Sequence, residues 1–154
     1  MAFLAFLAIS PSILAYSGTE RPTDKNIDKG DKQWGDLESL KYYDADDMYI
    51  KGKNGDPWYL SFIILKVEFK TDITNVGDEN IFVIRFKFFG GGTLQIKVYY
   101  TDGTYTPYSE TQQSTYLTKG YNIADNKVVD YIKFHSCEFL VPGKLYLDIV
   151  NVIY

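Results

Sequence analysis

The chain has 154 residues, 45% of them hydrophobic and 17% aromatic, which argues against disorder and predicts a single β-rich domain. Acidic residues outnumber basic residues by 20 to 16, so the chain carries no electrostatic footprint for nucleic acid. One cysteine, Cys137, and one histidine exclude an internal disulfide and a zinc cluster built from the usual Cys and His ligands.

An apolar run, Ala2–Ile9, lies at the start of the chain. It is shorter than the roughly 20 apolar residues that span a membrane, so we expect no stable membrane span. It fits the hydrophobic region of a signal peptide over residues 1–17, although no Lys or Arg lies near Met1. We therefore expect a secreted or cell-surface protein; a buried or disordered apolar arm is the alternative. Residues 18–33 predict a flexible polar lead-in to a β-sandwich domain over 34–154.

Short elements separated by turns are predicted between residues 34 and 58. We expect a short edge strand near Leu37–Leu40, then an acidic turn and a strand around Met48–Lys51. The segment Lys51–Trp58 is predicted to be a turn, because Asn-Gly and Asp-Pro pairs interrupt it.

Two strands, Tyr59–Lys70 and Ile81–Phe89, form the most hydrophobic part of the chain after residue 17. From Leu65 to Phe69 apolar and charged side chains alternate, and the second strand repeats this pattern. A period of two places the apolar side chains on one face of a strand. We expect these two strands to pair, and the later strands to cover the same core.

The rest of the chain also alternates like β-structure. An Asp-Gly pair between Tyr100 and Tyr105 is a strong hairpin signal. Further strands are expected at Thr93–Tyr100, near Ser114–Leu117 within the polar segment Thr104–Gly120, and at Val128–Phe134, Phe139–Val141 and Lys144–Tyr154. About eight or nine short strands and no long helix predict an all-β, two-sheet antiparallel β-sandwich.

Two segments carry a resemblance to a known fold family. The first is GDLESLKYYDADDMYI, and the second is the closing series IKVYYTDGTYT, VVDYIKF and LYLDIVNVIY. Together they resemble the galactose-binding-domain-like jelly rolls, the β-sandwiches of carbohydrate-binding-module type. The resemblance implies a two-sheet antiparallel jelly roll that is non-catalytic and belongs to exported proteins. Many relatives bind carbohydrate, and some hold a structural calcium ion.

Aromatic side chains are the candidate ligand-binding residues. An aromatic face can stack on a sugar ring while a phenol makes hydrogen bonds at its edge. The alternative is ordinary cross-strand pairing of aromatic residues on a sheet. The candidates lie around the predicted hairpin and the earlier turns: Trp34, Trp58, Tyr99, Tyr105 and Tyr108.

Asp44, Asp46 and Asp47 form the densest acidic cluster. Ca²⁺ takes six to eight oxygen ligands, commonly carboxylates and carbonyls. The resemblance implies a calcium site between an early loop and the last strand, which makes Asp148 a fourth candidate ligand. The alternative is a solvated turn whose Asp side chains bond to their own backbone. A structural Ca²⁺ is the one cofactor that we expect.

No catalytic constellation stands out in the sequence. His135 and Cys137 lie two residues apart, but a Cys–His nucleophile pair would also need an orienting third group and an oxyanion hole, and no family signature surrounds Cys137. We therefore expect a packed cysteine and no enzyme. The first hypothesis is a secreted or cell-surface domain that binds a glycan through exposed aromatic rings. The alternative is a structural or adhesion module of the cell envelope that contacts a surface protein.

Overall fold

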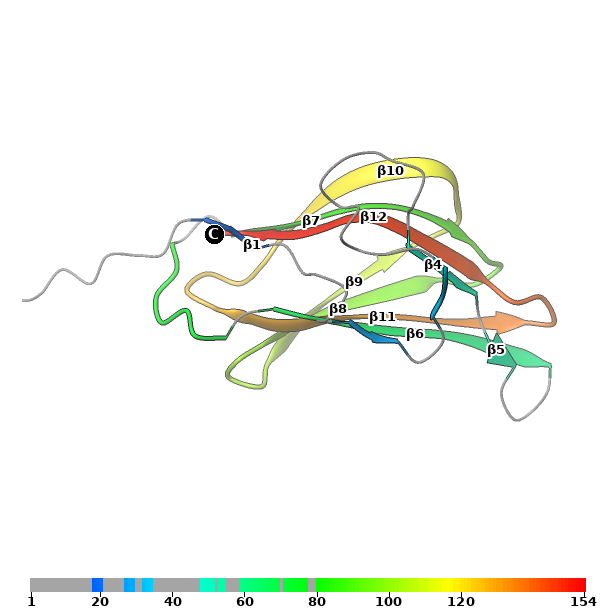
Figure 1. Cartoon of the computed structure of the whole chain (residues 1–154), viewed down its shortest axis with the longest axis horizontal. Helices are drawn as coiled ribbons and strands as arrows, with labels where there is room; N and C mark the ends of the chain where they lie inside the picture. Colours follow the sequence, from blue (N-terminus) through cyan, green and yellow to red (C-terminus); the bar gives the residue numbers. More distant parts are fainter. Residues whose placement is uncertain are drawn as a thin grey trace, which may run out of the picture.

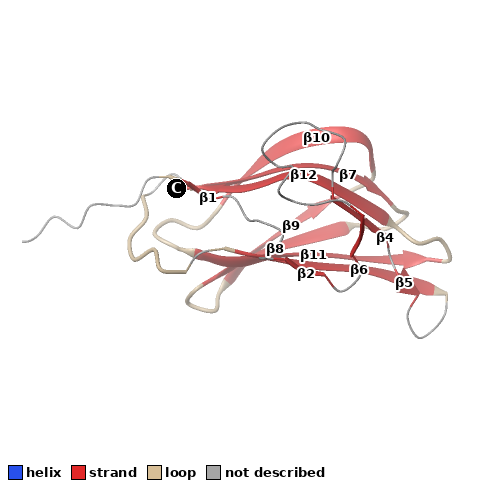
Figure 2. Ribbon diagram, in the orientation of Figure 1, coloured by secondary structure: helices blue, strands red, loops and turns tan. Residues whose placement is uncertain are grey.

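The computed structural model describes residues 18–20, 27–29, 32–34, 48–51, 53–54, 59–69, 71–77 and 80–154. These residues form twelve β-strands and include no helix (Figure 2), and so none that is long and apolar enough to cross a membrane. The strands are β1 (Thr19–Glu20), β2 (Ile27–Lys29), β3 (Lys32–Trp34), β4 (Met48–Lys51), β5 (Lys53–Asn54), β6 (Leu60–Glu68), β7 (Ile81–Phe89), β8 (Leu94–Tyr100), β9 (Tyr105–Glu110), β10 (Gln113–Asn122), β11 (Val129–Phe139) and β12 (Lys144–Ile153).

The strands build two antiparallel sheets that lie face to face (Figure 1). The β12 sheet has the order β10-β7-β12-β4-β3, with β1 also paired to β12. The β11 sheet has the order β2-β6-β11-β8-β9, with β5 also paired to β6. Among the eight strands of four residues or more, every connection between consecutive strands crosses to the other sheet except β8 to β9. This is the double Greek key of a jelly roll, so the predicted fold class is confirmed.

The core lies between the two sheets and follows directly from the alternation in the sequence. Every second residue of β7, from Phe82 to Phe88, is fully buried, and β6 buries Ile63, Leu65 and Val67 in the same way. β-branched and aromatic side chains dominate these strands because they suit a pleated surface with one buried face. The largest buried side chains are Phe82, Phe86, Phe88 and Phe134.

The expected pairing of Tyr59–Lys70 with Ile81–Phe89 is wrong. The first stretch contains β6, which pairs with β2, β5 and β11, and the second is β7, which pairs with β10 and β12. The two strands therefore face each other across the core from opposite sheets. Alternation shows which face of a strand is buried. It does not distinguish two strands that pair within one sheet from two strands in opposite sheets, because both arrangements produce the same alternation.

Other boundaries also differ from the prediction. Thr104–Gly120 holds β9 and most of β10 in place of one short strand, and β11 continues through Phe139. Phe139–Val141 is consequently the end of β11 and a turn, in which Leu140 adopts a left-handed φ of 64°. The strand Met48–Lys51 is confirmed as β4. Parts of the lead-in pair with the sandwich through β1, β2 and β3, whereas residues 1–17 and the expected strand Leu37–Leu40 lie outside the described residues.

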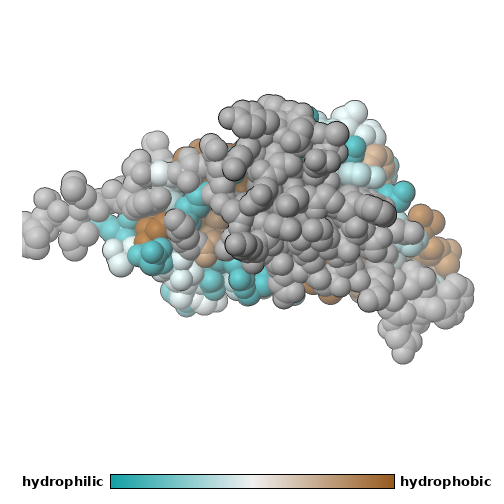
Figure 3. All heavy atoms as spheres, in the orientation of Figure 1, coloured by the Kyte–Doolittle hydropathy of each residue, from teal (hydrophilic) through white to brown (hydrophobic). Residues whose placement is uncertain are grey.

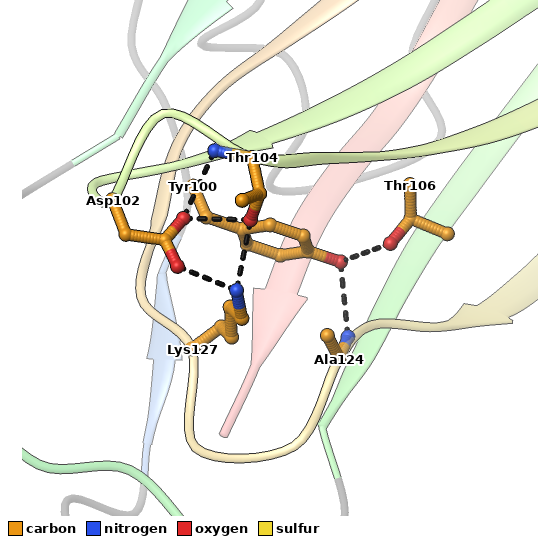
Figure 4. Close-up of polar contacts among 6 residues, drawn as sticks. All are labelled: Tyr100, Asp102, Thr104, Thr106, Ala124 and Lys127. Carbon is orange, nitrogen blue, oxygen red and sulfur yellow. Dashed lines mark hydrogen bonds and ion pairs between the residues drawn. The ribbon is translucent and has the colours of Figure 1, made fainter.

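The Asp-Gly hairpin between β8 and β9 is confirmed (Figure 4). Gly103 has a φ of +82°, which glycine adopts without the steric cost of a Cβ. The carboxylate of Asp102 accepts hydrogen bonds from the Thr104 amide at 3.0 Å and hydroxyl at 2.6 Å, and it pairs with Lys127. The Lys127 ammonium and the Thr104 donors hold the pKa of Asp102 well below its usual range.

The Tyr100 hydroxyl ties this hairpin to the following loop (Figure 4). It lies 2.7 Å from the Thr106 hydroxyl and accepts a hydrogen bond of 2.9 Å from the Ala124 amide. Tyr100→Phe leaves that amide without this partner, so we expect the free energy of unfolding to fall by about 1–3 kcal/mol in urea denaturation. Tyr105→Phe is the control, because Tyr105 is exposed. Equal losses in the two variants would contradict the bridging role.

Candidate functional site

The outer face of the β11 sheet carries three tyrosines in one row across three strands. Residues Ile132 and Phe134 of β11 point into the core, so Tyr131, between them in the alternation, points outward. The strand registers place Tyr131 opposite Tyr99 of β8, and Tyr99 opposite Tyr105 of β9. We call these three residues the tyrosine row.

The rings of the tyrosine row are in contact. Tyr131 and Tyr99 stack with centroids 4.4 Å apart and planes 18° apart, and Tyr99 and Tyr105 are 5.2 Å apart and tilted by 36°. Tyr105, at the outer strand, is 50% exposed. The Lys66 ammonium lies 4.4 Å from the centre of the Tyr131 ring, and the Lys97 ammonium 5.2 Å from that of Tyr105. Burial raises the pKa of the Tyr131 phenol, and the neighbouring Tyr99 raises it further.

A shallow polar groove adjoins the tyrosine row. Its volume is about 200 Å³, and adjacent outward residues of β8 and β11 line it: Gln95, Lys97, Tyr99, Lys133 and His135. An amide, two ammonium groups and an imidazole offer hydrogen-bond donors beside an aromatic wall. Such a surface can stack on a sugar ring and bond to its hydroxyl groups.

His135 lies at one end of this groove. Its ring centre is 6.4 Å from that of Phe62 on β6. Burial lowers the pKa of His135, and the charges of Lys133 and Lys97 lower it further, so the imidazole is neutral at pH 7. Cys137 follows on the same outward face and is exposed, so it is not packed as expected. His135 and Cys137 thus lie on one face of β11.

The five candidate aromatic residues have different places in the structure. Tyr99 and Tyr105 come together in the tyrosine row. Tyr108 lies on the inner side of β9, where its hydroxyl donates to the Asn122 carbonyl and its ring contacts Tyr121 at 4.7 Å. The backbone of Trp34 lies in β3 of the other sheet, and Trp58 lies outside the described residues.

Sequence analysis missed most of the groove. Tyr131, Lys97, Lys133 and Gln95 were not among the candidates, although each lies at an outward position of a predicted strand. The signal was the alternation itself, since the residues between the buried ones of β8 and β11 are Gln95, Lys97 and Tyr99, and Tyr131, Lys133 and His135. What alternation cannot supply is the register that joins the two series.

The predicted calcium site receives no support from Asp148. Asp148 lies at a bulge in β12 after Leu147, where its carboxylate is 1% exposed and paired with Arg85 of β7. A cation at that carboxylate would have to displace the guanidinium. No cluster of three or more metal-ligating side chains occurs in the described part of the chain, and Asp44, Asp46 and Asp47 lie outside it. The calcium site stays a prediction.

A second, apolar hollow lies at one end of the sandwich. It has a volume of about 540 Å³ and lies between the corner that joins β7 to β8 and the turn from β11 to β12. Next to it Phe139, Leu140 and Val141 are exposed, and Figure 3 shows hydrophobic atoms gathered at this end of the molecule. Phe89, Phe139 and Tyr146 contribute the aromatic part of its lining.

Solved structures with a similar fold include carbohydrate-binding modules. No family model and no curated protein matches the sequence of the chain. A variant of a family 29 carbohydrate-binding module is similar at a TM-score of 0.54 and 13% identity, over 88% of this chain and 91% of that one. Another variant of this module, described as complexed with cellulohexaose, has a TM-score of 0.54 and 12% identity, over 88% of this chain and 89% of that one. The resemblance stated from the sequence is thereby confirmed at the level of the fold: this chain is a two-sheet antiparallel jelly roll.

Proposed function

We propose that this chain is a non-catalytic binding module that takes a glycan on the outer face of the β11 sheet. The observation that carries the proposal is the tyrosine row beside the polar groove, on three adjacent strands. Rigid aromatic rings bury a large area at low entropic cost, and the groove supplies donors for hydroxyl groups. The likeness in fold to modules complexed with cellulohexaose and mannohexaose supports the same reading.

The test is binding of the chain to soluble oligosaccharides, including cellohexaose and mannohexaose, by isothermal titration calorimetry. We expect Tyr99→Ala and Tyr105→Ala each to weaken binding by roughly threefold to tenfold, since an aromatic contact contributes about 0.5–1.5 kcal/mol. Tyr105 is half exposed, so its loss leaves the core intact.

Tyr59→Ala is the matched control. Tyr59 is also well exposed, at 39%, and also has one aromatic neighbour, Phe139, at 5.6 Å. It lies beside the start of β6, at the opposite end of the sheet from the tyrosine row, so its replacement should leave binding unchanged. An equal loss of glycan affinity in Tyr59→Ala would mean that the tyrosine row is not the binding site. The absence of binding to any glycan would contradict the proposal.

A structural or adhesion module is the second candidate. The three exposed apolar residues Phe139, Leu140 and Val141 favour it, because contiguous apolar surface commonly marks a protein contact. Nothing in the described residues indicates what would cover them, so we place glycan binding first.

We also propose that the module is exported, to the medium or the cell surface. The apolar run Ala2–Ile9 supports export by its signal-peptide pattern, and it lies outside the described residues. Amino-terminal sequencing of the mature protein tests this proposal: a start near Gly18 is expected, and a retained Met1 would contradict it.

A further inference from the structure

Three lysines form a row next to the tyrosine row. The strand registers place Lys133 of β11 opposite Lys66 of β6 on one side and opposite Lys97 of β8 on the other. Adjacent strands are about 4.8 Å apart, and like charges placed directly opposite each other destabilise a sheet. The chain as a whole carries a formal charge of −4, so this row concentrates positive charge on a protein whose net charge is negative.

The protein itself neutralises only one end of this lysine row. Lys66 pairs with Glu68 at 2.6 Å and lies over the Tyr131 ring. Lys97 lies over the Tyr105 ring but pairs with no carboxylate, and Lys133 has no ion pair within the described residues. The two lysines without a carboxylate are the two that line the groove.

The lining of the groove contains cations and neutral groups alone. Besides Lys97 and Lys133 it consists of Gln95, Tyr99 and His135, so none of its side chains is acidic. Glu68 pairs with Lys66 at 2.6 Å, and the strand register places Asp28 of β2 opposite Lys66, so these carboxylates belong to the Lys66 end of the row. The same two ammonium groups disfavour a proton on His135, which is what a positive local field does to a neighbouring imidazole.

We infer that the ligand of this groove is an anionic glycan, which stacks a sugar ring on the tyrosine row and places its acidic groups against Lys97 and Lys133. The inference rests on the proposed glycan-binding function and names the class of glycan. An ammonium is a compact point charge without the fork geometry that would select one planar anion, so uronic-acid carboxylates and sulfate esters share the required chemistry. A neutral glycan would leave the repulsion among the three lysines uncompensated, whereas an acidic one relieves it on binding.

The test compares anionic hexasaccharides with their neutral parents on the full chain. The pairs are mannuronate with mannose, galacturonate with galactose, and sulfated galactose with galactose, measured by isothermal titration calorimetry at low and high salt. We expect at least one acidic member to bind roughly fivefold tighter than its parent, the order expected of two partly exposed ion pairs. The advantage should shrink as salt screens it. The carboxylate and sulfate pairs distinguish the two sources of charge.

Lys97→Met with Lys133→Met removes the charges and keeps most of the apolar stems. This double variant should bind the acidic member no more tightly than the neutral parent, and it should melt no lower than the unaltered chain because the repulsion is gone. The control is Lys87→Met with Lys144→Met, which changes net charge equally on β7 and β12 of the other sheet. This control variant should keep the preference for the acidic member.

Each outcome decides between the two proposals. Binding of neutral and acidic members with equal affinity would overturn the anionic inference and leave the glycan-binding function standing. A preference lost equally in both double variants would also overturn it, since the effect would then come from net charge alone. Failure to bind any member of the three pairs would overturn both proposals.

Discussion

Arg85→Met is expected to lower the free energy of unfolding by about 3–5 kcal/mol, because it leaves a buried carboxylate without its cation. Asp148 is 1% exposed, and its carboxylate pairs with the Arg85 guanidinium of the neighbouring strand β7. Asp148 lies at the bulge of β12, and because its side chain is almost fully buried, water cannot replace the lost partner. Urea denaturation at neutral pH measures the loss.

Lys87→Met is the matched control for Arg85→Met. Both cations lie 4.4 Å from the centre of the Tyr116 ring on the same face, so the control removes the cation–aromatic contact without leaving a buried charge. We expect it to cost less than about 1 kcal/mol. Adding Asp148→Asn to Arg85→Met should recover part of the stability. If the single and double variants are equally unstable, the ion pair is not the cause.

The pH dependence of Arg85→Met gives an independent check. An unpaired buried carboxylate has a raised pKa, so in this variant the folded state binds a proton more readily than the unfolded state. Its stability should therefore rise, relative to the unaltered chain, as the pH falls from neutrality toward the ordinary pKa of a carboxyl group. A constant difference across that range would contradict the burial argument for Asp148.

Phe82→Ala is the second large expected effect, with a loss of about 3–5 kcal/mol on unfolding. Phe82 of β7 is fully buried, stacks on Tyr121 with ring centres 5.5 Å apart, and meets the edge of Phe134 in the opposite sheet at 6.5 Å. Truncation opens a cavity between the two sheets, which cannot close without moving both. The midpoint of urea denaturation measures the loss.

Phe139→Ala provides the comparison for Phe82→Ala. Phe139 is 66% exposed and contacts Tyr59 at the end of the sandwich, so its removal should cost less than about 1 kcal/mol. The loss of stability in Phe82→Leu should lie between those of Phe82→Ala and Phe139→Ala. Similar losses for Phe82 and Phe139 would mean that the core is not where the burial pattern places it.

The sequence predicted the strands with a buried face and failed where a strand has none. Residues 81–89 were predicted with the correct bounds because Phe82, Ile84, Phe86 and Phe88 alternate with outward residues. Most of β10 was missed because it is the outer strand of its sheet, and side chains on both of its faces are largely exposed, so it shows no period of two. The sequence also did not indicate which sheet a strand belongs to: β6 and β7 were expected to pair, but they lie in different sheets.

The candidate site was predictable only as far as local geometry extends. Tyr99 and Tyr105 were both candidates because a two-strand hairpin brings them together around the Asp-Gly turn. Tyr131 and Lys133 lie beside these residues because β11 pairs with β8. The sequence around either residue does not indicate the register of that pairing. The lysine row has the same origin, since its members come from three strands distant in the sequence.

The central places of β11 and β12 constrain when this domain can fold in the cell. β11 lies between β6 and β8, and β12 lies between β7 and β4, so each sheet is joined through a strand that the ribosome makes last. Before then only pairs of consecutive strands, such as β5–β6 and β8–β9, can form from neighbouring residues, while the apolar faces of β6 and β7 stay open. Nearly all pairing must close long loops, which is slow. We expect the newly made chain to depend on chaperones until β12 is inserted.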